Sequence, residues 1–229
     1  MLSAAEWEIV ALSLRVGVVA TVVALPPAFA LAWALARRDF PGRFLLDGLV
    51  HLPLVLPPVV TGWLLLLAFG RNGALGSLLA ECCDVVVAFR WTGAAIAAAV
   101  MALPLMVRSL RLSLEAVDRR LENAARTLGA GPARVFFTIT LPLATPGILA
   151  ATVLGFARSL GEFGATITFV SNIPGETRTL PLAIYSAMQL PDGDSLVMRL
   201  SLVSIALALV ALGVAESLLR RQSRGRHVL

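Results

Sequence analysis

Two oppositely charged residues stand in an otherwise apolar stretch of this sequence. Arg158 and Glu162 are four positions apart, between the apolar runs Ile148–Ala157 and Phe163–Val170. On a helix, this spacing brings a guanidinium and a carboxylate together. An arginine in apolar surroundings can line or gate a pathway for an anion, or it can form a static ion pair that fixes helix packing. The pathway interpretation is favoured, and its candidate residues are Arg158, Ser159, Glu162 and Thr166.

A second constellation occupies a polar, arginine-bearing loop at about 111–142. Ala124 and Ala125 are followed after three residues by Gly129, and after nine more by the segment Ile139–Pro142. Apolar residues recur at helical spacing up to the glycine, which predicts one helix from Leu110 to Leu128. Glycine is the usual residue just after a helix end, so the chain is expected to reverse there.

The charged residues of this predicted helix are spaced for ion pairs. Glu115 and Glu122 each precede an arginine by four positions, Arg119 and Arg126, in the favourable acid-first order. Pro132 follows closely and suits the first turn of a second helix, where its missing N–H does no harm. The loop is therefore predicted to be a helix, a sharp turn and a second helix.

The small and apolar residues of the loop fit a docking surface. Ala124 and Ala125 allow a partner to approach the helix backbone closely, and Gly129 permits a reversal that larger residues resist. The returning chain is expected to be anchored at the membrane surface by Ile139, Leu141 and Pro142. The alternative is an ordinary amphipathic helix at a membrane interface, which the apolar stripe alone would allow. The complete spacing favours docking.

Composition excludes several kinds of chemistry. All 19 basic residues are arginines, so the chain lacks the lysine of a GxxxxGK[ST] phosphate-binding loop and is not itself an ATPase. The arginines flank apolar runs instead of forming a basic domain, which argues against nucleic-acid binding. Cys82 and Cys83 are adjacent and His51 is isolated, too few ligands for a metal cage. We expect no catalytic residue, no metal and no bound cofactor in this chain.

The elements that must position these residues are membrane-spanning helices. The 229-residue chain is 58% hydrophobic and only 14% charged, which is more apolar than a soluble domain of this size can hide. About 20 residues of helix cross the hydrocarbon core of a bilayer. We predict one all-α integral membrane domain, residues 1–229, with five spans at about 9–36, 48–70, 90–110, 143–166 and 197–218.

Arginine placement predicts the orientation of these spans. Thirteen arginines follow the first, third and fifth spans, whereas Arg71, Arg90, Arg178 and Arg199 occupy the other two connections. Because positive charge is retained on the cytoplasmic side, the N-terminus is expected outside, and the loop 111–142 and the C-terminus inside. A short outer helix is expected near Leu180–Gln189.

The loop sequence LENAARTLGAGPARVFFTITLP resembles the EAA coupling loop of ABC importer permeases. Its coupling positions are Glu122, Asn123, Ala124, Ala125, Gly129, Ile139, Leu141 and Pro142. The family pattern has glutamate directly before the two alanines, where this chain has Asn123; the acidic contact to an ATPase then comes from Glu122 or is absent. The segments SLGEFGAT and FVSNIPGETRT are similar to molybdate importer permeases, and sulfate/thiosulfate permeases carry a related segment.

This resemblance implies a type I ABC importer permease in the bacterial inner membrane. Two copies would form one pathway for molybdate or tungstate, each resting on an ATP-binding cassette ATPase subunit that uses ATP-Mg. A periplasmic oxyanion-binding protein would deliver the anion. Two alternatives stay open: a sulfate/thiosulfate ABC permease and, less favoured, an ion-coupled secondary oxyanion transporter. The second would need no docking loop, and such carriers often show two similar halves, for which this sequence gives no convincing sign.

Overall fold

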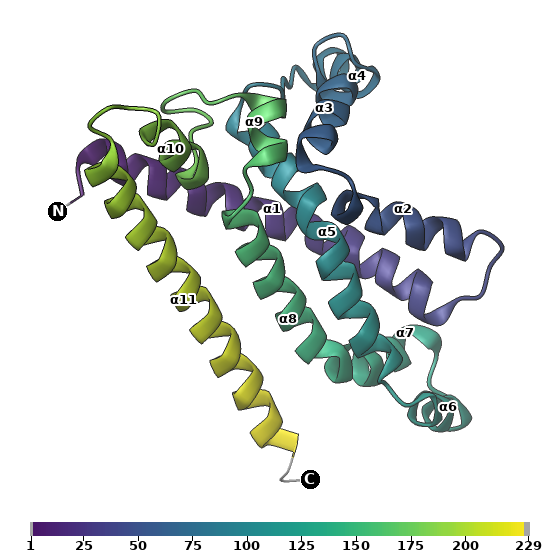
Figure 1. The fold of residues 1–229 in the computed structure, drawn as a ribbon. Coiled ribbons are helices and arrows are strands. Elements are labelled where there is room, and N and C mark those ends of the chain that lie inside the picture. The colour runs from purple at the N-terminus through teal and green to yellow at the C-terminus, as the bar shows by residue number, and fades with distance from the viewer. Residues whose placement is uncertain (1, 227–229) are drawn as a thin grey trace.

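The computed structural model describes residues 2–226, and this part of the chain is helical without strands. Residues 1 and 227–229 of the predicted 1–229 domain lie outside the described residues. The elements are α1 (Ala4–Arg37), α2 (Arg43–Val55), α3 (Pro58–Phe69), α4 (Ala74–Cys83), α5 (Trp91–Glu115), α6 (Arg119–Thr127), α7 (Pro132–Val135), the π-helical turn η1 (Phe136–Thr140), α8 (Leu141–Leu160), α9 (Gly164–Val170), α10 (Leu180–Ala187) and α11 (Asp194–Arg226). The all-α prediction is confirmed (Figure 1).

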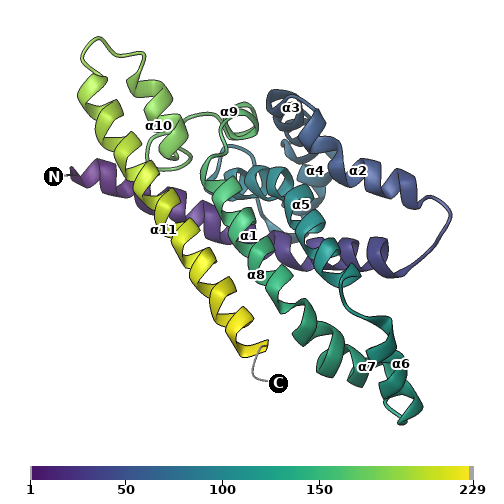
Figure 2. The ribbon, with the colours of Figure 1, turned by 60° about the horizontal axis from the view of Figure 1, so that its bottom comes forward.

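The centre of the bundle is formed by α1, α5 and α8, with α1 crossing the other two (Figures 1 and 2). Small residues repeat at every fourth position on the buried faces of two of these helices. They are Ala20, Ala24, Ala28 and Ala32 on α1, and Gly147, Ala151, Gly155 and Ser159 on α8. Small residues let helix backbones approach closely, which is how helices associate where lipid removes the hydrophobic driving force.

The α8 glycines show how close this approach is. A Cβ atom added at Gly155 would lie 2.6 Å from the sulfur of Met106 on α5, and one at Gly147 would overlap the side chain of Ser113. Any larger residue would push α8 away from α5. The spacing of small residues therefore dictates the helix pairing.

The second predicted span, 48–70, is not a single helix. Two helices, α2 and α3, meet at an angle of 114° across a short break. Pro57 and Pro58 lie at this point, and Pro58 occupies the first turn of α3. A residue that precedes proline is pushed out of the helical region, so consecutive prolines end one helix and begin another. Residues 2–226 thus contain four helices of spanning length and composition, or five spans if the bent pair counts as one.

The fourth predicted span, 143–166, is also wrong as one helix. The helix starts earlier, running without a break from Pro132 through η1 to Leu160, and α9 follows separately after Gly161–Phe163. The two broken segments pack against each other at one end of the bundle (Figure 1). A Cβ atom at Gly62 of α3 would lie only 2.5 Å from the Ala165 carbonyl oxygen of α9.

Helices α10 and α11 attach at the same end of the bundle. The expected short helix near Leu180–Gln189 is present as α10. It forms a small apolar cluster with α1 and α11, whose buried members are Val10, Leu180, Ala183 and Leu200. An ion pair of 2.8 Å joins Arg199 of α11 to the buried Glu6 of α1. The α6–α7 loop and the C-terminal part of α11 lie at the opposite end (Figure 1).

Candidate functional site

The loop between α5 and α8 begins with a helix break that the sequence did not reveal. The prediction of one helix from Leu110 to Leu128 is wrong, because α5 ends at Glu115 and α6 begins at Arg119. The carboxylate of Asp118 accepts a hydrogen bond of 2.8 Å from the backbone N–H of Arg120, which caps α6. Helix α6 can therefore take an orientation of its own.

Because of this break, the apolar residues of the predicted helix do not share one buried face. Leu110 and Leu114 of α5 are fully buried, whereas Leu121 and Leu128 of α6 are 50% and 89% exposed. Glu122, one of the charged residues of the predicted helix, is buried. The leucines of α6 thus point away from the rest of the chain.

Glu122 faces inward because it binds residues from two other elements. Its Oε1 atom accepts a hydrogen bond of 2.6 Å from Thr140 of η1 and lies 3.1 Å from Nη2 of Arg37, at the end of α1. The side chains of Arg37 and Glu122 are only 9% and 10% exposed. In this conformation the carboxylate is turned away from the loop surface, which favours the alternative that the acidic contact is absent, and the role of Glu122 toward an ATPase stays a prediction.

The two ion pairs predicted within the loop are also replaced. Glu122 pairs with Arg37 instead of Arg126, and Glu115 accepts a hydrogen bond of 2.9 Å from Arg111 instead of Arg119. The Glu115–Arg119 spacing assumed a continuous helix, which the break after Glu115 removes. Long-range packing places Arg37 next to Glu122, and no local periodicity shows this.

Gly129 makes the predicted reversal. Its φ of +85° lies in the left-handed region, where a side chain is disfavoured. Its N–H donates to the Arg126 carbonyl and the Ala130 N–H donates to the Ala125 carbonyl, both at 3.0 Å, which is the Schellman pattern. The prediction that the helix ends at Gly129 is confirmed, and Pro132 opens α7 as expected.

The end of the loop contains a π-helical turn, η1, which ends at Thr140, two residues before Pro142. In a regular α-helix, the ring of a proline clashes with the carbonyl four residues earlier, here that of Thr138. The wider turn gives the ring room while the helix continues into α8. It also brings Thr140 to Glu122, so the Pro-bearing end of the motif supports α6.

The predicted coupling residues divide into an outer and an inner group. Those exposed are Asn123, Ala124, Gly129 and Pro142; those partly buried are Ala125, Ile139 and Leu141; Glu122 is buried. On α6, one outward surface is formed by Leu121, Ala124, Ala125 and Leu128, which we call the docking face. The surface of α6 is therefore apolar and rimmed by arginines, and its acid is internal.

The predicted pair Arg158–Glu162 is present, with Nη1 and Oε2 2.7 Å apart. Arg158 lies in the last turn of α8, and Glu162 lies in the break before α9. The other carboxylate oxygen of Glu162 accepts a hydrogen bond of 2.9 Å from the Ala165 N–H, in the first turn of α9. Glu162 thus joins the two halves of a broken helix, which is the geometry of the static alternative.

The four candidate pathway residues differ in accessibility. Glu162, Ser159 and Thr166 are buried within the chain, and Ser159 belongs to the small-residue stripe of α8. Arg158 alone is partly open, with 26% of its side chain exposed. A role in the pathway stays a prediction for this set, with Arg158 best placed to meet an anion.

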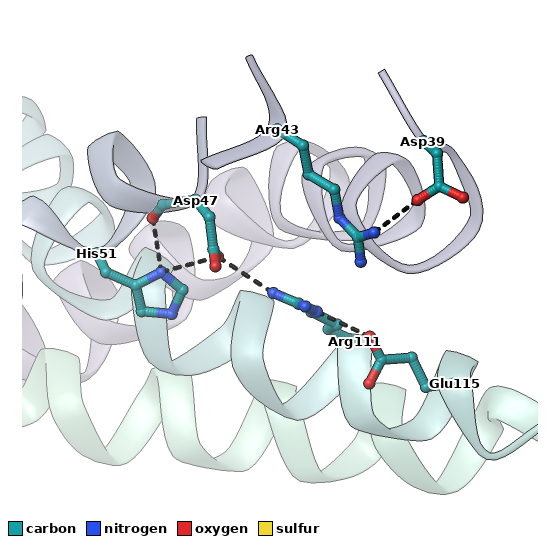
Figure 3. Close-up of polar contacts among 6 residues, drawn as sticks. All are labelled: Asp39, Arg43, Asp47, His51, Arg111 and Glu115. Carbon is teal, nitrogen blue, oxygen red and sulfur yellow. Dashed lines mark hydrogen bonds and ion pairs between the residues drawn. The ribbon is translucent and has the colours of Figure 1, made fainter. Parts of the chain in front are cut away.

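A polar network that the sequence did not indicate ties α2 to α5 (Figure 3). Asp47 of α2 accepts a hydrogen bond of 3.2 Å from Arg111 of α5 and lies 3.3 Å from Nδ1 of His51. Arg111 also binds Glu115. Asp47 and Arg111 are 64 positions apart in the sequence. The only sequence signal for this contact is that each of the two apolar helices carries a charged residue. The bent α2–α3 segment is thereby attached next to the start of the loop.

The fold of this chain is similar to the folds of solved ABC transporter chains. It superposes on a chain of a bacterial alginate ABC transporter, solved in complex with an alginate pentasaccharide-bound periplasmic protein, with a TM-score of 0.75 and 17% sequence identity. The match covers 96% of this chain and 80% of that one. The architecture is that of a type I ABC importer permease.

The family is shown by sequence. Residues 28–224 match the model of the binding-protein-dependent transport system inner membrane component, and the chain belongs to this family. It is therefore a multi-pass inner-membrane permease. The molybdenum transport system permease protein ModB of Escherichia coli is 59% identical over 223 residues, 96% of this chain and 97% of that protein. The sulfate transport system permease protein CysW of Synechococcus elongatus is 38% identical over 95% of this chain and 76% of that protein.

Replacing Glu122 by alanine is expected to destabilise the protein by about 3 kcal/mol, because it leaves the buried guanidinium of Arg37 without its carboxylate. Denaturant unfolding of the purified chain in detergent micelles measures this. The matched control is Asp39→Asn, which breaks an exposed ion pair with Arg43 and is expected to change stability little. Equal effects of the two substitutions would contradict a structural role for the Arg37–Glu122 pair.

Proposed function

We propose that this chain is the permease subunit of an ATP-driven importer that carries molybdate, or the related tungstate, into the cytoplasm. The observation that carries the proposal is the 59% identity to a molybdenum transport permease over nearly the whole of both chains. Sulfate transport is the alternative, and the sulfate permease is a more distant relative, at 38% identity. An ion-coupled carrier is disfavoured by membership of a binding-protein-dependent family.

The docking face is proposed to receive the partner ATPase, which would use ATP-Mg, while this chain binds no cofactor. An apolar helix surface with small residues at its centre fits a groove on a partner, and the surrounding arginines suit an acidic rim. Leu128 is 89% exposed, more than Leu121 on the same face. On the positive-inside argument, the loop and the C-terminus are cytoplasmic and the N-terminus is outside.

The contacts of α6 give it a rigid connection to the membrane helices. Glu122 joins it to α1 through Arg37 and to α8 through Thr140, which precedes that helix without interruption. A displacement of α6 by a closing ATPase dimer would then move α1 and α8 together. The bends between α2 and α3 and between α8 and α9 are the points at which the segments around this core can change angle.

The translocation pathway is proposed to form between two copies of this chain, with an oxyanion-binding protein delivering the substrate outside. Many apolar side chains of α2, α3 and α11 are exposed in the single chain, as expected of surfaces that meet lipid or a second copy. Arg158 is proposed to meet the anion when the cavity opens, since it is the accessible cation of the Arg158–Glu162 pair.

The substrate is tested by reconstituting the permease with its ATPase and binding protein in liposomes. Labelled molybdate uptake is expected to require ATP and to resist excess sulfate, as the relationship to molybdenum permeases indicates. Uptake abolished by sulfate would assign the sulfate alternative. Uptake without ATP would refute the importer mechanism itself.

The loop reversal provides a test against an ion-coupled mechanism. Gly129→Val should reduce ATP-driven uptake about tenfold, because a side chain in the left-handed region costs roughly 1–2 kcal/mol and a β-branched one is strained there. Gly131→Val is the matched control, since Gly131 has an ordinary φ of −68° and open space around it.

An ion-coupled carrier, which has no use for the reversal, would keep its activity in both variants. Full ATP-driven uptake by Gly129→Val would likewise contradict a coupling role for this turn.

A further inference from the structure

A basic cavity of about 420 Å³ lies beside the loop, between the end of α1, α6 and the start of α8. Its charged lining residues are Arg37, Arg38, Arg119, Glu122 and Arg126, and Asn123 and Thr140 are polar and uncharged. The single carboxylate is already neutralised by Arg37. Within residues 2–226, no ion pair is found for the other three arginines, so the cavity holds an excess of positive charge.

One cation of this cavity is buried and incompletely satisfied. The side chain of Arg37 is 9% exposed, and its Nε atom has no hydrogen-bond partner among the described residues. A buried guanidinium N–H without an acceptor is unfavourable. An oxyanion in the cavity would bring acceptors to the arginines that line it, which phosphate oxygens do well.

An apolar groove of about 510 Å³ adjoins the cavity along α1. The two share Trp33, Arg38 and Phe136 in their linings, and the groove continues over Phe29, Ala30 and Ala34. The rings of Trp33 and Phe136 pack edge to face with centroids 5.2 Å apart. Aromatic residues at this position are typical of the boundary between headgroups and hydrocarbon.

We propose that the cavity and the groove together bind one anionic glycerophospholipid. The phosphate group occupies the basic cavity, and an acyl chain lies in the groove along α1. Basic pockets between membrane helices are known to select such headgroups. A free anion would account for the cavity and leave the groove unexplained, whereas a lipid accounts for both. Its headgroup bridges α1, α6 and η1, the elements that Glu122 connects.

Lipid retention by the full-length chain in detergent, measured by native mass spectrometry, tests the headgroup site. Dioleoyl phosphatidylglycerol is expected to bind in preference to dioleoyl phosphatidylcholine. The double variant Arg38→Gln/Arg126→Gln should bind phosphatidylglycerol about 25-fold more weakly, because each interfacial arginine contributes about a factor of five. The control Arg120→Gln/Arg134→Gln removes the same charge from exposed positions outside the cavity and should bind like wild type. Equal binding of the two lipids, or equal losses in the two variants, would overturn the proposal.

The groove is tested by comparing lipids with acyl chains of different length. This comparison uses the wild-type chain, so it tests the proposal even if the arginine variant fails to fold. Wild-type chain should bind dioleoyl phosphatidylglycerol more tightly than the dihexanoyl form, and Ala30→Phe should remove this difference by filling the groove. Val23→Phe, at an exposed position of α1 outside the groove, is the control. If both lipids bind alike and inorganic phosphate displaces them, the cavity takes a free anion and the lipid assignment is wrong.

Discussion

The buried ion pair between Arg37 and Glu122 is the interaction on which the arrangement of the loop depends. Two charges buried together are stable only when paired closely and given further hydrogen bonds, and Thr140 supplies one here. Because the carboxylate must face Arg37, the opposite side of α6 must face outward, and that side carries Leu121 and Leu128. One internal contact therefore creates the exposed apolar surface. The same contact links α6 to both α1 and the helix that continues into α8.

Small residues and helix breaks divide the helical bundle into two kinds of region. The centre is tightly packed, and the surrounding segments contain bends. The alanine repeat of α1 and the Gly-Ala-Gly-Ser repeat of α8 allow these helices to pack tightly around α5. The 114° bend at Pro57–Pro58 and the break at Gly161–Phe163 lie outside this centre and pack against one another. A permease that moves as rigid parts needs both features: a core that transmits displacement, and segments that can change their angle.

Sequence reasoning recovered the features that are encoded locally. The left-handed turn at Gly129, the start of a helix at Pro132 and the Arg158–Glu162 spacing follow from residue types a few positions apart. It failed where a distant partner decides the conformation. Sequence spacing predicts a Glu122–Arg126 pair, because periodicity cannot show that Arg37, 85 positions away, offers a buried site. Likewise, the predicted helix from Leu110 to Leu128 continued an apolar stripe through residues 116–118, where capping by Asp118 begins a new helix.

The inward orientation of Glu122 is tested most directly by measuring which face of α6 the bound ATPase covers. In a background with Cys82 and Cys83 replaced by serine, single cysteines at Leu128 and at Arg126 report the docking face and the opposite side of the helix. Maleimide labelling in membranes is then compared with and without the ATPase bound. We expect bound ATPase to slow labelling at position 128 and to leave labelling at position 126 unchanged. Protection at position 126 with continued reactivity at 128 would contradict it.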